Sequence, residues 1–224
     1  MATALSDLIQ TVRNRTNTEN SQFVKDTELT FYINSSLAEL DDLLVGMYED
    51  YKMTDGYQTT ITTGNSIIMP PDFHQSRIVE KQISGNWMTL KRYGLQDRNR
   101  YSSPTIRSFE GMTDIKYKLC GNVIDIIPAT QANGLYQIAY TPLYIPLVNT
   151  TDTLQPYMDQ QAWHEYAVAD VCAKVYTKFK FDPAGFVQAK MALQQRIIAA
   201  ANIRDAGGVK CVQDTRNGGS GGFR

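Results

Sequence analysis

Few residues of this chain have the type and spacing that catalysis or metal binding requires. His74 and His164 are the only histidines, and neither has Cys, Asp or Glu at metal-ligand spacing with a third ligand. His164 stands beside Glu165 and Trp163 on a predicted helix, which favours a structural histidine. We therefore predict no metal, no cofactor and no catalytic residue, so the chain is not expected to be an enzyme.

Two further patterns resemble catalytic motifs, but the residues around them do not provide the structural setting that catalysis requires. Residues 218–222 satisfy G-x-S-x-G, but a nucleophile elbow needs a strand before it and a helix after it, and this glycine-rich terminus offers neither. The adjacent carboxylates Asp41 and Asp42 are predicted on a solvated helical face. Neither would then gain the desolvation that raises a pKa for general acid work.

Composition indicates a folded protein without a membrane-spanning segment. The chain has 224 residues, 42% of them hydrophobic, enough for one substantial core or a core plus a small satellite. No apolar run approaches the roughly 20 residues of a membrane span, and the first residues lack a secretory pattern. The three cysteines fall outside any C-x-x-C pair, which predicts neither disulfides nor zinc and suits a reducing cytosol: Cys120, Cys172 and Cys211.

Charge is nearly balanced overall and uneven along the chain. The net charge of -1 argues against a protein that grips nucleic acid by basicity alone. Residues 26–55 nevertheless hold eight acids and one base, whereas the chain from Glu165 onward holds nine bases and five acids. This polarity permits head-to-tail association of copies, or an acidic surface that nucleic acid slides past. Solvated helix faces are the alternative interpretation.

Helical periodicity marks both ends of the chain. Residues 4–14 predict a short amphipathic helix, and residues 26–51 carry an apolar stripe over about seven turns, with Asp26 as its cap. The stripe suits packing within the subunit or against a neighbour's helix, and the intrachain core is favoured. Residues 163–179 predict another helix, and a last helix runs from Asp182 as cap to Gly207.

The middle of the chain has a residue composition that is typical of strands and turns. Short runs of Thr, Tyr, Ile and Val stand between Gly, Asn and Pro, with a tight turn at Thr63–Asn65 between the first two strands. Residues 87–101 suit a short helix or a basic loop. The predicted strands are 57–63, 65–70, 76–83, 115–119, 122–128 and 135–145.

These elements predict an α+β fold: a helical bundle of about four helices with an inserted antiparallel β subdomain and an extended C-terminal tail. The predicted parts are residues 1–55, the N-terminal helices; 56–150, the β subdomain; 151–206, a helical hairpin that completes the bundle; and 207–224, the tail.

Two segments are candidate contact surfaces. Arg and Tyr alternate in residues 91–101, which suits single-stranded nucleic acid or another protein, and Asp97 together with the net charge favours the protein. The predicted contact residues are Arg92, Tyr93, Arg98, Arg100 and Tyr101. The tail, 207–224, is too polar and glycine-rich to fold alone, so it either frays or is received by a partner, and extended it reaches on the order of 55 Å.

Several motifs then follow one another in order. The run F-V-x-D-x-E-L-x-x-Y-I-N-x-S-x-x-E-L-x-x-L-L extends from Phe23 to Leu44 and opens the long helix. It is followed by Pro71-Asp72-Phe73, by Trp87 and Leu90 in W-x-x-L, by GNVIDIIP, by YTP, and by NIRDAG at the end of the last helix. Over nearly the whole chain this order resembles the head-to-tail adaptor, or connector, proteins of tailed bacteriophages.

The resemblance implies a structural role in the neck of a virion. Such a protein forms a ring, with twelve copies expected, that docks under the portal protein and offers a platform to tail or nozzle proteins. Packaged double-stranded DNA would pass through the lumen without specific binding, and acids of the long helix are candidates to line it. Assembly would occur in the host cytoplasm, and no membrane is implied. A tail-completion or tail-tube protein is the alternative.

The resemblance also assigns a role to the tail. It implies that the C-terminal extension threads into clefts of the portal, while the β subdomain reaches neighbouring copies or tail proteins. The expected portal-binding residues are Val209, Val212, Arg216, Phe223 and Arg224.

Overall fold

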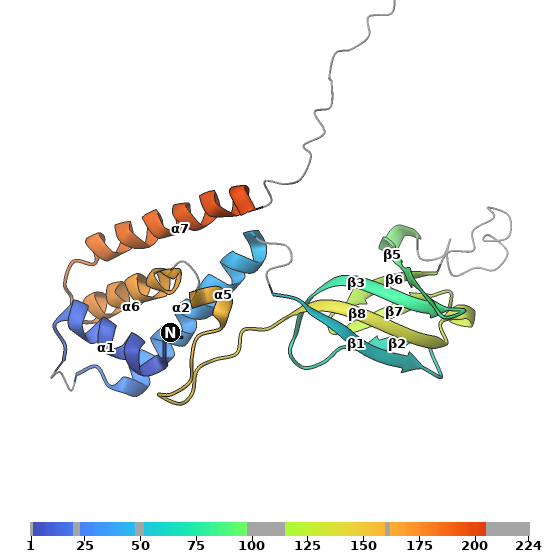
Figure 1. The fold of residues 1–224 in the computed structure, drawn as a ribbon, viewed down its shortest axis with the longest axis horizontal. Coiled ribbons are helices and arrows are strands. Elements are labelled where there is room, and N and C mark those ends of the chain that lie inside the picture. Colours follow the sequence, from blue (N-terminus) through green and yellow to red (C-terminus); the bar gives the residue numbers. More distant parts are fainter. Residues whose placement is uncertain (1, 20–22, 48–51, 98–114, 160–161, 205–224) are drawn as a thin grey trace, which may run out of the picture.

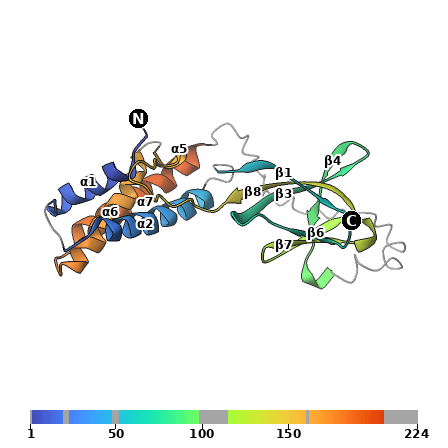
Figure 2. The same cartoon turned by 90° about the horizontal axis from the view of Figure 1, so that it is seen from below.

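The computed structural model describes residues 2–19, 23–47, 52–97, 115–159 and 162–204. Within them the fold is mixed α+β, with five α-helices and two four-stranded sheets. Figure 1 shows an elongated molecule with the helices at one end and the sheets at the other, and Figure 2 shows the same separation from below. We call these two ends the helical unit and the β unit.

The helices follow the periodicity of the sequence closely. Asp26 is the first residue of the long helix, and the Asp182 carboxylate accepts a hydrogen bond from the Ala184 N–H at 2.9 Å, as a capping residue does. The predicted stop at Gly207 lies outside the described residues. The helices are α1 (Leu5–Thr16), α2 (Asp26–Met47), α5 (Pro156–Asp159), α6 (His164–Lys178) and α7 (Ala184–Arg204).

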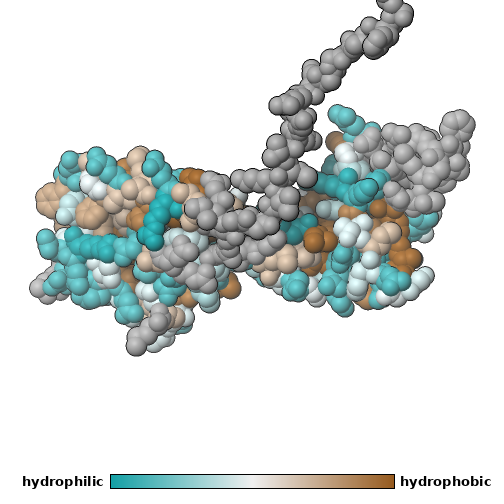
Figure 3. All heavy atoms as spheres, turned by 45° about the horizontal axis from the view of Figure 1, so that its top comes forward, coloured by the Kyte–Doolittle hydropathy of each residue, from teal (hydrophilic) through white to brown (hydrophobic). Residues whose placement is uncertain are grey.

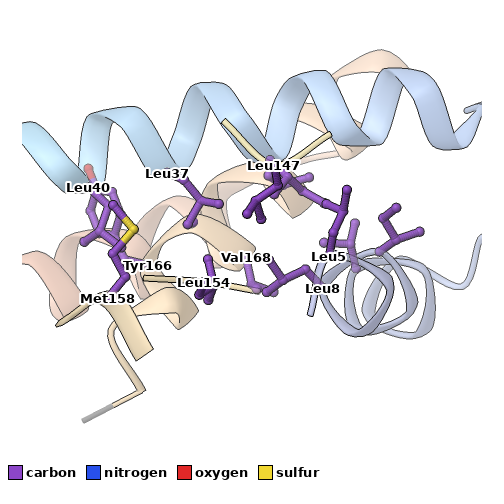
Figure 4. Packing of buried hydrophobic residues seen from close by; sticks show 14 of the residues in the cluster. Leu5, Leu8, Leu37, Leu40, Leu147, Leu154, Met158, Tyr166 and Val168 are labelled. Atoms are coloured by element: carbon purple, nitrogen blue, oxygen red, sulfur yellow. The ribbon is translucent and has the colours of Figure 1, made fainter. Parts of the chain in front are cut away.

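The apolar stripe of α2 packs within the subunit. Leu37 and Leu40 of α2 face Val168 and Tyr166 of α6, with Leu8 of α1 beside them (Figure 4). The segment that returns from the β unit closes this core with three more buried side chains: Leu147, Leu154 and Met158.

Two sheets form the β unit, and their strands interleave along the chain. The first has the order β1-β8-β3-β4 and is antiparallel throughout; the second has the order β2-β7-β6-β5 and is antiparallel except for the parallel pair β5–β6. Buried residues from both sheets form a second core, which includes Val79, Ile124 and Ile138. The strands are β1 (Thr54–Ile61), β2 (Ser66–Ile68), β3 (Phe73–Ile83), β4 (Asn86–Thr89), β5 (Lys91–Arg92), β6 (Lys116–Cys120), β7 (Val123–Ile127) and β8 (Gly134–Pro142).

The expected turn at Thr63–Asn65 lies between β1 and β2, which belong to different sheets, and it contains Gly64 at a φ of 83°. Another expectation about the β unit is corrected. Residues 87–97 form strands β4 and β5 and a short 3₁₀ helix (Leu95–Asp97) in place of the expected helix or loop. The reason is a two-residue hairpin turn at Ser84 and Gly85, whose positive φ angles of 51° and 86° match the twist of the flanking strands.

Candidate interaction surfaces

An ionic cluster ties the β unit to the helical unit where the chain passes between them. Asp41 of α2 is buried, and its carboxylate accepts hydrogen bonds from Lys52 Nζ at 3.0 Å and from the Tyr157 hydroxyl of α5. Lys52 also donates to the main-chain carbonyl of Leu143 at 3.0 Å. The outgoing and returning segments are thus held on α2. Asp41 therefore does not lie on the solvated face that was predicted for it, because its partners come from distant parts of the chain.

The side chain of Asn34 fastens the returning segment to the middle of α2. Its amide donates to the Leu147 carbonyl and accepts from the Leu147 N–H, both at 2.8 Å. The Tyr144 hydroxyl donates to the same amide oxygen at 3.0 Å. Burial raises the pKa of Tyr144, which keeps this hydroxyl protonated. A polar side chain on an apolar helix was the only sequence signal of this contact.

A second ionic cluster joins α2, α6 and α7. The Asp170 carboxylate accepts from Ser36 Oγ at 2.6 Å, and it pairs with Lys174 at 2.7 Å and with Lys190 of α7 at 2.9 Å. Lys190 also contacts Glu39 at 2.8 Å. Burial by itself would raise the pKa of Asp170, but the hydrogen bonds from Lys174, Ser36 and Lys190 outweigh it and hold that pKa below its usual value.

The acids of α2 are largely occupied by cations of the same chain. Asp26 pairs with Arg13 at 2.5 Å, and Glu28 pairs with Lys178 at 2.5 Å. Glu39 and Asp41 belong to the two clusters above. The charge of these four acids is therefore compensated within the chain. They do not support the prediction that acids of this helix line a channel for DNA.

The helical unit leaves several aromatic side chains exposed. Phe31 is 69% exposed, and it borders a cleft of about 490 Å³ between α2, α6 and the start of α7. Near the end of α6, Phe23 lies 5.1 Å from Phe179 between ring centres, and Phe179 stacks on Phe181 at 6.0 Å. Large exposed apolar side chains on a folded unit indicate contact with another molecule when they gather.

The β unit and the returning segment expose apolar side chains as well. Figure 3 shows hydrophobic residues on the visible face of the β unit. Ile83, Trp87 and Met88 belong to the β3–β4 hairpin, which ends the first sheet at one edge. The returning segment adds Ile145 and Val148, which are 65% and 75% exposed.

The predicted contact residues have different positions. Arg92 is exposed on β5, but Tyr93 is only 6% exposed, and its N–H donates to the Tyr117 carbonyl at 3.0 Å. Tyr93 therefore supports the sheet and is removed from the predicted contact surface. The other predicted contact residues lie outside the described residues: Arg98, Arg100, Tyr101, Val209, Val212, Arg216, Phe223 and Arg224.

Neither a metal site nor a membrane helix is found in the described part of the chain. No group of three or more His, Cys, Asp or Glu side chains is placed to hold a metal ion there, and none of its helices is long and apolar enough to span a bilayer. His164 Nδ1 lies 3.2 Å from an oxygen of Asp159, and Glu165 pairs with Arg15 at 2.6 Å.

Comparison with known proteins adds no assignment. No family profile matches this chain, and no curated protein sequence matches it.

Proposed function

We propose that this chain is a structural head-to-tail adaptor of a tailed bacteriophage, which forms a ring under the portal in the neck of the virion. The observation that carries the proposal is that both units expose large apolar side chains, including Phe31 and Phe181 at one end and Trp87 and Met88 at the other. An elongated subunit with contact surfaces at both ends suits head-to-tail closure of identical copies into a ring. The order of the sequence motifs, which resembles that of head-to-tail adaptor proteins, indicates that this ring lies in the neck of a virion.

In this proposal the four longer helices act as a bundle that builds the ring, and the β unit reaches neighbouring copies and tail or nozzle proteins. The ionic clusters at Asp41 and Asp170 support such a mechanical role, because they brace the helical unit and its connection to the β unit. Residues 207–224 would form an extended tail that enters the portal. Ordering this tail costs free energy, and repetition around a ring of twelve copies offsets that cost through avidity.

The proposal leaves the DNA in a passive role. Packaged double-stranded DNA crosses the ring without specific binding, consistent with a net charge of -1. The cations that pair with the acids of α2 have their charge compensated, so they leave no excess positive charge there to bind DNA phosphates. A tail-completion or tail-tube protein is the alternative function, and it differs in attaching to tail components in place of the portal.

A truncation tests the proposal. We expect that deletion of every residue after Gly207 leaves the thermal unfolding of the chain unchanged, because both cores lie before that residue. We also expect it to abolish docking on the purified portal of the same phage, measured by electron microscopy of the mixture. The unmodified full-length chain is the control and should dock.

Two results would contradict the proposal. Equal docking by the truncated and full-length chains would refute the role of the tail. Attachment of the full-length chain to purified tails and not to the portal would favour the tail-completion alternative.

A further inference from the structure

Strand β3 contacts the end of α2 through two residues that interrupt its pairing with β8. The register between the two strands shifts once at His74 and again at Arg77, so each of these is an additional residue on β3. Such additional residues are β-bulges, which bend a strand and redirect a side chain. The two bulged residues of β3 are the ones that reach the helical unit.

Both contacts of β3 are made with the C-terminal part of α2. The Arg77 guanidinium donates to the main-chain carbonyl of Val45 at 3.4 Å and to the Thr141 hydroxyl of β8 at 3.1 Å. His74 Nε2 lies 4.0 Å from a carboxylate oxygen of Asp42. Asp42 and Val45 are three positions apart, so they are neighbours on the surface of the helix. The start of β3 therefore lies against one side of α2.

The two contacts respond differently to pH. A guanidinium stays protonated throughout the pH range of folded proteins, whereas histidine changes its charge between about pH 5 and 8. At 4.0 Å from Asp42, a neutral imidazole is too distant for a hydrogen bond, so the attraction between the two side chains depends on the charge of the imidazole. The Arg77 contact is therefore constant, and the His74 contact becomes an ion pair only when the imidazole is protonated.

The other described carboxylates near this contact are held elsewhere. They are Asp41 of α2, which pairs with Lys52 at 3.0 Å; Asp72 before β3, which accepts from the Tyr140 hydroxyl at 3.1 Å; and Asp55 of β1, which β8 separates from β3. Of the described carboxylates, Asp42 is the one that lies within 4.0 Å of the His74 imidazole. The Asp42 side chain is 73% exposed, so it is free to approach or leave the imidazole.

The contact lies to one side of the point where the chain passes between the units. Lys52 Nζ donates to the Asp41 carboxylate and to the Leu143 carbonyl, so the outgoing and returning segments meet there. An α-helix turns by about 100° per residue, so Asp42 projects from another side of α2 than Asp41. A contact away from the crossing point restrains rotation of the β unit about that point.

We propose that His74 and Asp42 form a pH-dependent switch that sets how firmly the β unit is held against the helical unit. Protonation of the imidazole adds an ion pair between β3 and α2. Its loss as the pH rises lets the units reorient about Lys52 and Leu143. The inference does not depend on the proposed function, because it concerns the connection between the units of one chain.

The test measures NMR residual dipolar couplings of the full-length chain at pH 5.5 and at pH 8. The couplings of each unit give the magnitude of its alignment, and the two magnitudes are equal when the units move as one body. We expect the ratio of the two magnitudes to depart from one about two- to fivefold more at pH 8 than at pH 5.5, because an exposed ion pair shifts a population by about that factor.

Three variants separate the charge of the pair from its packing. His74→Gln and Asp42→Asn should each show the larger departure at both pH values, because neither can form the ion pair. His74→Lys carries a permanent cation and should show the smaller departure at both. The control is His164→Gln, which removes the other histidine, on α6, and should keep the pH dependence of the wild type.

Several results would overturn the inference. Equal ratios at the two pH values in the wild type would deny the switch, and so would a pH dependence that persists in His74→Gln or in Asp42→Asn. A lowered thermal midpoint of His74→Gln at pH 8 would make His74 a structural residue. Glu49 and Asp50 follow α2 in the sequence and lie outside the described residues. The Glu49→Gln/Asp50→Asn variant should keep the pH dependence, and its loss there would assign the partner of His74 to these two acids.

Discussion

Individual polar residues hold distant parts of this chain together. Asp170 is 8% exposed and receives hydrogen bonds from Ser36, which lies 134 positions away, and from Lys190 on α7. A buried carboxylate of this kind is stable only while its donors are in place, because an unpaired charge in the interior is costly. The cluster around Asp170 therefore makes the position of α7 depend on a few side chains.

Replacement of Asp170 tests this dependence. We expect Asp170→Asn to lower the free energy of unfolding by about 3 kcal/mol at neutral pH, because Lys174 and Lys190 lose their buried partner. Urea unfolding measures the change. Asp42→Asn on the exposed side of α2 is the control and should change stability by less than about 0.5 kcal/mol.

The same residue predicts a pH dependence. The folded-state pKa of Asp170 lies below the ordinary value, so its contribution is complete above the unfolded pKa of about 3.9 and is lost as the pH falls through the folded pKa. The difference in stability between the wild type and Asp170→Asn should therefore shrink as the pH falls below about 4. A difference that stays constant down to pH 2 would contradict the assigned role of the charge.

At the scale of elements, the returning segment is the part that joins the two units. It has no regular secondary structure between β8 and α5, yet Leu147 and Leu154 are buried in the helical core. Its main chain is held by the amide of Asn34 and by main-chain hydrogen bonds to the start of the chain, such as those from the Leu154 N–H to the Thr3 carbonyl and from the Leu5 N–H to the Asp152 carbonyl, both at 2.9 Å. Backbone groups fastened in this way take the place of a ladder or helix.

The Asn34→Ala variant tests this attachment. We expect it to lower the free energy of unfolding by about 2 kcal/mol, because the N–H and carbonyl of Leu147 lose their partner. Hydrogen exchange of the Leu147 amide should accelerate. Asn149→Ala changes an exposed amide of the same segment and should leave that protection in place. Unchanged exchange in Asn34→Ala would show that the Asn34 amide is not needed to hold the segment.

The whole molecule contains two separate cores. One is built by the helices and the returning segment, and the other by the two sheets. The connection between them passes through Lys52 and Leu143, which meet beside Asp41, and the guanidinium of Arg77 on β3 also donates to the Val45 carbonyl of α2 at 3.4 Å. Two cores with so narrow a connection are expected to open independently.

A pair of core substitutions tests this independence. Leu37→Ala and Ile124→Ala each empty space at a fully buried site, in the helical and the β unit respectively, and each should cost about 3 kcal/mol. We expect each variant to lower the thermal transition of its own unit only, as measured by calorimetry with residue-resolved hydrogen exchange. A single transition lowered equally by both variants would show that the units unfold as one.

The local pattern of the chain could be predicted, whereas most of its polar contacts could not. The stripe of α2, the cap at Asp182 and the main strands follow from periodicity and turn chemistry, which act over a few residues. The burial of Asp41, Lys81 and Tyr93 was missed, because the groups that surround them come from other strands and helices.

By itself, the sequence determined the class of the fold and the order of most of its elements, since these depend on residue type and spacing. Only the tertiary structure decided that β1 and β2 belong to different sheets, that four of the acids of α2 pair with cations of the same chain, and that Lys81 and Tyr93 are buried. The reason is that burial and pairing depend on groups that are far apart in the chain. Local propensity depends on neighbouring residues only, so it does not predict which distant groups come into contact.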